Sequence, residues 1–399
     1  MNIHYPAYYS RFTCIGGACE DTCCAGWQIG IDDESYRSYR NVQGDFGRRL
    51  RKGINHQERV FRLHGRRCAF WGRDGLCDIY RELGRDGLCR TCRTYPRHVE
   101  DYGDLQEVML SLSCPEAARL ILGGGTDGRF LEKEHPGKAE PLKNRAFLDL
   151  LQDIRQTMAE ILEKQDMTWE ERLAMILAFA HDIQRRLPEL KPGMLGETAL
   201  PDEARQLRQA VEALSRRYLA SDAPARFSRR LAPYRNRGRE ALLRIAAWVR
   251  ESAELEPVVG DWRRSQERLC HQLYHRVDME KTARQRKDFA VRALRFGQQW
   301  ENLVLYFINT FLLGAVYDGD VLGKVKLSLF SYAVIRENCL AASRGTGELT
   351  AKMIVSAAYR YSREVENSDR NLETLEQDFC RNRLFGMDGM MTVILEGPG

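Results

Sequence analysis

The sequence predicts a mainly α-helical protein, with an irregular cysteine-rich domain at its N-terminus followed by an α-helical domain. Nine of the twelve cysteines lie within the first 114 residues, among glycines too frequent for long regular elements. From about Asn144 onward, hydrophobic residues recur at spacings of three and four, as on one face of an α-helix. We therefore expect a cysteine-rich domain at 1–122, a linker at 123–143 and a helical domain at 144–399.

The composition is that of an ordinary globular protein. The 399 residues are 43% hydrophobic and 29% charged, a balance that excludes a disordered or fibrous chain. The mean hydropathy is -0.48 and no apolar run reaches about 18 residues, so we expect no membrane span. The opening MNIHYPAYYSRF lacks the basic and apolar regions of a secretory signal. We therefore expect a cytoplasmic protein.

The cysteine-rich segment is expected to form loops and short helices. No stretch of the chain alternates between hydrophobic and polar residues for more than a few positions. The sequence therefore predicts no strand of more than a few residues. The segment 123–143 contains three consecutive glycines, two prolines and scattered charges without a hydrophobic period. That composition is typical of a linker.

Periodic patterns predict the helices of the C-terminal domain. Thr168 precedes Glu171 by three residues, a capping-box pattern that predicts a helix over 172–187. Prolines and glycines at 188–196 predict a loop after it. The clearest hydrophobic stripes are Leu151, Ile154, Met158 and Ile161; Leu207, Val211, Leu214 and Tyr218; and Trp300, Leu303, Val304, Phe307, Ile308 and Phe311.

The early cysteines are candidate metal ligands. In a reducing compartment, clustered thiols more often bind metal or take part in redox chemistry than form disulfides. Thiolates are soft ligands that suit zinc or an iron–sulfur centre. Only one close C-x2-C pair of the kind used by structural zinc sites is present, so the spacing favours iron–sulfur over zinc. The candidates are Cys14, Cys19, Cys23, Cys24, Cys68, Cys77, Cys89, Cys92 and Cys114.

A subset of these nine cysteines is expected to bind the metal. They allow one four-thiolate centre or two such centres, and the spacing does not choose between them. A disulfide-linked domain is the alternative, although it would leave an odd thiol. The widely spaced Cys270, Cys339 and Cys380 are expected to be small apolar residues of the core.

Basic residues flank the last close pair of cysteines. Arg93 and Arg97 are candidates to bind the carboxylate of a nucleotide or amino-acid cofactor. They could instead offset the negative charge of a reduced cluster. A solvated basic loop is the alternative interpretation.

The cysteine motifs resemble those of the flagellin lysine-N-methylase family, which belongs to a broader zinc- or iron-chelating group. The resemblance covers about the first 120 residues and rests on the runs YYSRFTCIGGACEDTCCAGWQIGID, CAFW, GLCDIY, LGRDGLCRTCRTYPR and SLSCPE. It implies that methyl groups are transferred from S-adenosylmethionine to lysine side chains of flagellin. It also implies that cysteines of the motif hold a 4Fe–4S cluster.

The motifs of familiar methyl-donor pockets are missing. The chain has no convincing glycine-rich turn between a strand and a helix, and it lacks the C-x3-C-x2-C spacing usual for radical S-adenosylmethionine enzymes. A donor pocket is therefore expected against the cluster. A lysine ammonium must lose a proton before it attacks a methyl group. Glu20, Asp21 and Tyr95, close to cysteines in the sequence, are the candidate bases.

Charge is distributed unevenly along the chain. Residues 226–295 carry a local charge of +9, whereas the whole chain carries +5. We expect this segment to dock a protein substrate or to form a solvated surface. We do not expect nucleic-acid binding, since the chain lacks the expected motifs; a basic nucleic-acid-binding regulator is one alternative function. A non-catalytic zinc- or iron-binding or redox-sensing module is the other alternative.

Overall fold

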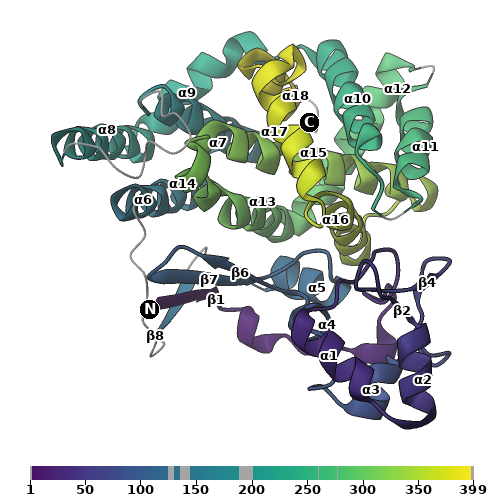
Figure 1. The fold of residues 1–399 in the computed structure, drawn as a ribbon. Helices are drawn as coiled ribbons and strands as arrows, with labels where there is room; N and C mark the ends of the chain where they lie inside the picture. The colour runs from purple at the N-terminus through teal and green to yellow at the C-terminus, as the bar shows by residue number, and fades with distance from the viewer. Residues whose placement is uncertain are drawn as a thin grey trace.

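The computed structural model describes residues 2–124, 130–134, 144–187, 201–258, 260–275 and 277–396. The fold is mainly α-helical, which confirms the predicted fold class. A large helical body lies beside a smaller N-terminal part that is built from short elements and one sheet (Figure 1). None of the described helices combines the length and apolar character that a membrane span needs.

The N-terminal part combines short helices with short strands, and the short helices agree with the prediction. The helices are α1 (Asp33–Asn41), α2 (Gly44–Lys52), α3 (Asp78–Leu83), α4 (Arg90–Thr94) and α5 (Pro115–Gly123), with 3-10 helices η1 (Tyr9–Arg11) and η2 (Gly16–Ala18). The strands are β1 (Asn2–Pro6), β2 (Ile54–Asn55), β3 (Val60–Phe61), β4 (Leu63–His64), β5 (Arg67–Cys68), β6 (Arg97–Asp101), β7 (Leu105–Leu110) and β8 (Phe130–Glu134).

The four-stranded sheet differs from the sequence prediction. Its strand order is β6-β7-β1-β8, with β1 parallel to β7 and antiparallel to β8. Within the predicted linker, Phe130–Glu134 forms a strand that pairs along β1. Its sequence FLEKE gave no strand signal, since its charged side chains are exposed at the edge of the sheet.

The helices of the helical body are α6 (Arg145–Leu162), α7 (Trp169–Gln184), α8 (Pro201–Leu219), α9 (Ala223–Leu231), α10 (Gly238–Glu254), α11 (Trp262–Tyr274), α12 (Met279–Ala293), α13 (Gly297–Phe311), α14 (Ala315–Asp318), α15 (Val321–Thr346), α16 (Ala351–Val365), α17 (Asp369–Arg381) and α18 (Met387–Glu396). The three predicted hydrophobic stripes lie on α6, α8 and α13. The 3-10 helices between them, in the part of the chain that the structure describes, are η4 (Ala232–Tyr234), η5 (Leu294–Phe296), η6 (Leu312–Gly314) and η7 (Arg383–Phe385).

The capping box of α7 is confirmed. The Thr168 hydroxyl accepts a hydrogen bond from the Glu171 amide, and the Glu171 carboxylate accepts one from the Thr168 amide. The helix begins at Trp169 rather than Arg172, because Thr168 is itself the N-cap. The loop predicted at 188–196 lies outside the described residues.

Two hydrophobic cores hold the chain together. The larger core contains α15 at its centre, packed against α7, α13 and α16, and it also takes in side chains of the sheet and of α5. The smaller core lies between Ile29 and Cys89 and is formed by the cysteine-rich segment itself. The domain boundaries at 1–122, 123–143 and 144–399 stay a prediction. Helix α5 packs on α13 and α16 and thereby joins the N-terminal part to the helical body.

Candidate functional site

Five cysteine thiols from three segments gather in the N-terminal part. The Cys24 thiol shares hydrogen bonds with the thiols of Cys23 and Cys77. The Cys92 thiol is hydrogen-bonded to Cys89 and is within electrostatic range of Cys23 and Cys24. We call Cys23, Cys24, Cys77, Cys89 and Cys92 the inner thiol group. Both cysteine-rich stretches of the sequence thus contribute to one place.

Short local structure brings these thiols together. Cys77 and Cys89 are the N-caps of α3 and α4, and Cys92 lies one helical turn beyond Cys89. The Cys68 amide donates a hydrogen bond to the Cys24 carbonyl at 2.8 Å, which fastens the early cysteines to β5. Cys68 itself is buried in the smaller core.

Burial and mutual contact change the acidity of the inner thiol group. The neighbouring Cys23 thiol raises the pKa of Cys24 to about 12. Contact with Cys24 and burial raise the pKa of Cys77 far above its usual value. The hydrogen bond from the Cys92 thiol lowers the pKa of Cys89. The thiols of Cys24 and Cys77 therefore hold their protons near neutral pH, and a metal would have to displace those protons.

Three further early cysteines form a second set. Cys114 is the N-cap of α5 and interacts electrostatically with Cys19 and Cys14. Burial raises the pKa of Cys114 to about 11 and also raises the pKa of Cys19. The nine early cysteines thus divide into the inner thiol group, this set and the buried Cys68.

The donor chemistry fits a thiolate-bound centre. Soft sulfur donors are the ligands that iron–sulfur and zinc sites use, and all twelve cysteines are free of disulfides. Within the described ranges, no three His, Cys, Asp or Glu side chains are arranged around a common point as in a metal site. A metal ligand role for any of the nine cysteines stays a prediction.

The later cysteines follow the core prediction only in part. Cys339 is completely buried in α15, as predicted. Cys270 is half-buried. The expectation is wrong for Cys380, which is exposed on α17 with its sulfur 3.9 Å from an Asp320 carboxylate oxygen.

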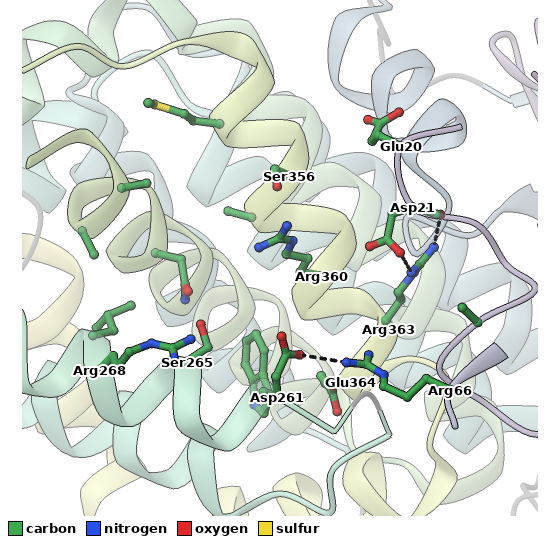
Figure 2. A pocket seen from close by; sticks show the side chains of 18 of the residues that line it. Glu20, Asp21, Arg66, Asp261, Ser265, Arg268, Ser356, Arg360, Arg363 and Glu364 are labelled. Carbon is green, nitrogen blue, oxygen red and sulfur yellow. Dashed lines mark hydrogen bonds and ion pairs between the residues drawn. The ribbon is translucent and has the colours of Figure 1, made fainter. Parts of the chain in front are cut away.

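A cavity of about 680 Å³ lies between the N-terminal part and helices α11, α15 and α16 (Figure 2). The N-terminal part contributes Glu20, Asp21, Ala25, Arg66, Arg67 and Trp71. The polar side chains from the helical body are Asp261, Ser265, Arg268, Gln272, Asn338, Ser356, Arg360, Arg363 and Glu364. The walls therefore carry both carboxylates and guanidinium groups, as a site for a zwitterionic ligand or a charged side chain would.

A small void lies next to this cavity. The void measures about 10 Å³ and is lined by residues that include Cys23 and Tyr95. Ala25 and Arg363 line both the void and the cavity. One cysteine of the inner thiol group thus lines the void together with two residues of the cavity wall.

Arg363 of α16 joins the two walls of the cavity. Its guanidinium forms an ion pair with an Asp21 carboxylate oxygen at 2.6 Å and donates to the Asp21 carbonyl at 2.6 Å (Figure 2). It also donates to the Ser113 carbonyl at 2.9 Å. Because only 7% of this side chain is exposed, these bonds are strong positional constraints on the loop that carries the first cysteines.

The structure brings the three candidate bases to this region. Glu20 and Asp21 line the cavity, and Glu20 forms an ion pair with Arg119. Tyr95 lines the void, with its hydroxyl 3.0 Å from the Ser113 hydroxyl, and burial raises its pKa. Their catalytic role stays a prediction.

The two arginines proposed for cofactor binding lie elsewhere. Arg93 is exposed on α4, and the Arg97 guanidinium lies over the rings of Phe12 and Tyr9 at 5.3 and 5.8 Å. Neither residue lines the cavity or the void, and their cofactor role stays a prediction. No sequence pattern points to Arg363 or Glu364, because they lie in an ordinary helix far along the chain from the cysteines.

Comparison with known proteins assigns the chain to a family. The model of the FliB lysine N-methylase C-terminal domain matches residues 155–393, which is more than half of the chain. A lysine-N-methylase of Salmonella typhimurium is 32% identical over 132 residues, covering 31% of this chain and 33% of that protein. The flagellar biosynthetic protein FliU of Salmonella muenchen is also 32% identical over 132 residues, covering 31% of this chain and 78% of FliU.

The match extends over a limited part of the lysine-N-methylases. The chain spans about a third of the length of the lysine-N-methylases it matches. No solved structure matches the chain. Because the family model covers most of the helical body, the chain belongs to the FliB lysine N-methylase family.

Proposed function

We propose that this protein is a lysine N-methyltransferase that uses S-adenosylmethionine to methylate flagellin. Family membership supports lysine methylation, and the name of FliU supports a flagellar link. One observation supports the location of the reaction. The cavity, with carboxylates and guanidinium groups on its walls, shares Ala25 and Arg363 with the small void that Cys23 lines. We place the target lysine and the methyl donor in this cavity.

We also propose that four cysteines of the inner thiol group hold a 4Fe–4S cluster. The support is the gathering of five soft donors from three segments, one more than such a cluster needs. A bound cluster would supply iron next to the cavity as an electrophilic or redox centre. Zinc bound by the same thiols is the alternative.

The side chains of the cavity suit a lysine substrate. Trp71 and Trp262 offer apolar surface to the four-carbon stem. Asp21, held in place by Arg363, offers a carboxylate to the ammonium group or to the proton that it releases. In the transfer, the lysine nitrogen forms a bond to the methyl carbon while the carbon–sulfur bond of the donor breaks. The donor leaves as a neutral thioether, and the released proton passes to the base.

Mass spectrometry of flagellin tests the proposed activity. Flagellin is incubated with anaerobically purified protein and S-adenosylmethionine, and its tryptic peptides are analysed. We expect added methyl groups on lysines, and far fewer with the Asp21→Asn variant. Asp166→Asn, an exposed residue away from the cavity, is the matched control and should retain activity. Unmodified lysines with protein that carries its full iron content would contradict the proposal and favour a non-catalytic metal-binding module.

A further inference from the structure

Some arginines of the basic segment 226–295 have carboxylate partners. Arg226 pairs with Asp222 at 2.8 Å, and Arg237 pairs with Asp388 at 3.0 Å. These pairs neutralise part of the excess charge within the fold. Arg268 has no carboxylate partner among the residues that the structure describes, and it lines the cavity.

Two other arginines at the cavity share this property. Arg67 of β5 and Arg360 of α16 are exposed, line the cavity and lack a carboxylate partner within the described part of the chain. Figure 2 shows Arg268 and Arg360 on different helices around the same cavity. We call Arg67, Arg268 and Arg360 the arginine rim.

The arginine rim can bind an anion. The Arg67 guanidinium is held over the Trp71 ring at 4.7 Å, which limits its freedom before any ligand arrives. Guanidinium groups bind carboxylates through paired, planar hydrogen bonds, a geometry that lysine does not provide. The rim residues are exposed, whereas Arg363 and Glu364 on the same cavity wall are buried. The rim therefore lies where a protein substrate would meet the cavity.

We propose that the arginine rim binds acidic side chains that flank the target lysine in the protein substrate. This inference rests on the proposed function, because it assigns the cavity to a lysine of another protein. The carboxylate of the methyl donor has the same chemistry and is the competing ligand. The exposure of all three arginines favours the protein substrate, since a small donor bound beside Cys23 would meet buried groups first.

Peptide binding tests the rim without requiring turnover. Two fluorescent peptides of equal length carry a central lysine, flanked by aspartates in one and by asparagines in the other. We expect the full-length protein to bind the aspartate peptide about tenfold more tightly at low salt, as three exposed ion pairs would provide. The Arg268→Glu/Arg360→Glu double variant should lose this preference. Fluorescence anisotropy measures both affinities.

A matched double variant controls for overall charge. Arg284→Glu/Arg295→Glu changes two exposed arginines of α12 and η5 that do not line the cavity, and it should keep the preference. Equal binding of both peptides by the unmodified protein, or an unchanged preference in Arg268→Glu/Arg360→Glu, would overturn the proposal. A peptide preference that the control variant also loses would assign binding to general charge and overturn it as well.

Calorimetry with S-adenosylmethionine separates the two sources of carboxylate. An unchanged donor affinity in Arg268→Glu/Arg360→Glu supports the protein substrate. A donor affinity that falls tenfold assigns the rim to the donor and overturns the proposal. If the protein binds the aspartate peptide more tightly but never methylates flagellin, the proposed function is contradicted. The binding of acidic side chains by the arginine rim is then still supported.

Discussion

At the scale of single residues, Arg363 connects the cysteine-rich loop to the helical body. Its guanidinium is bound to the side chain and the backbone of Asp21 and to the backbone of Ser113. These contacts fix the segments that carry Cys19, Cys23 and Cys114 against α16. No pattern in the sequence could reveal this role, because it depends on residues about 250 and 340 positions apart.

Replacement of Arg363 by methionine should destabilise the protein strongly. The change leaves the Asp21 carboxylate and two carbonyl groups without their partner, at a cost of about 3 kcal/mol. The exposed Arg370, which pairs with Glu256 at 3.1 Å, is the control, and Arg370→Met should cost less than about 1 kcal/mol. Denaturant unfolding measures both changes. Equal effects of the two substitutions would show that Arg363 is not an anchor.

The carboxyl group of Glu366 should make stability depend on pH. Burial raises its pKa from 4.5 to about 7, while the Tyr306 hydroxyl donates to it at 2.7 Å. Because the folded protein favours the protonated form, this contribution is fully present below pH 4.5 and is lost as the pH rises through about 7. Glu366→Gln keeps the neutral form, so its melting temperature should rise relative to the unmodified protein between pH 5 and about 8. A difference that stays constant over this range would contradict the assignment.

At the scale of elements, local signals account for the helices and fail for the sheet. The hydrophobic stripe of α13 and the capping box of α7 are local, and both predict a helix that the structure contains, although α7 begins at Trp169 rather than Arg172. Strands β1 and β8 consist of five residues each, and they pair with each other although they lie more than a hundred residues apart along the chain. Their pairing depends on long-range contacts rather than on a repeated pattern. The concentration of cysteines in the first 114 residues predicts that their thiols gather in one part of the fold. No sequence pattern predicts which residues line the cavity.

The N-cap of α7 offers a test at this scale. Thr168→Ala removes the hydroxyl that accepts from the Glu171 amide, and it should lower the free energy of unfolding by about 1 kcal/mol. Thr168→Ser retains the hydroxyl and should cost a few tenths of that amount. Thermal and denaturant unfolding of both variants provide the measurement. An alanine variant as stable as the serine variant would show that the cap contributes nothing.

At the scale of the whole molecule, the cavity exists because two parts of different character meet. The cysteine-rich part contributes a loop with carboxylates next to the thiols, and the helical body contributes buried and exposed arginines. The sequence predicts each part separately, from cysteine spacing and from helical periodicity. It does not predict their contact surface, because that surface is formed by single polar residues from α11, α15 and α16.

The most direct measurement is a paired determination of iron content and lysine methylation in cysteine variants. Anaerobically purified protein should contain about four iron atoms per chain and should methylate flagellin. Cys24→Ser and Cys92→Ser should lose both the iron and the activity, whereas the exposed Cys380→Ser should keep both. Full methylation by the Cys24→Ser and Cys92→Ser proteins without bound metal would contradict the proposed role of the inner thiol group.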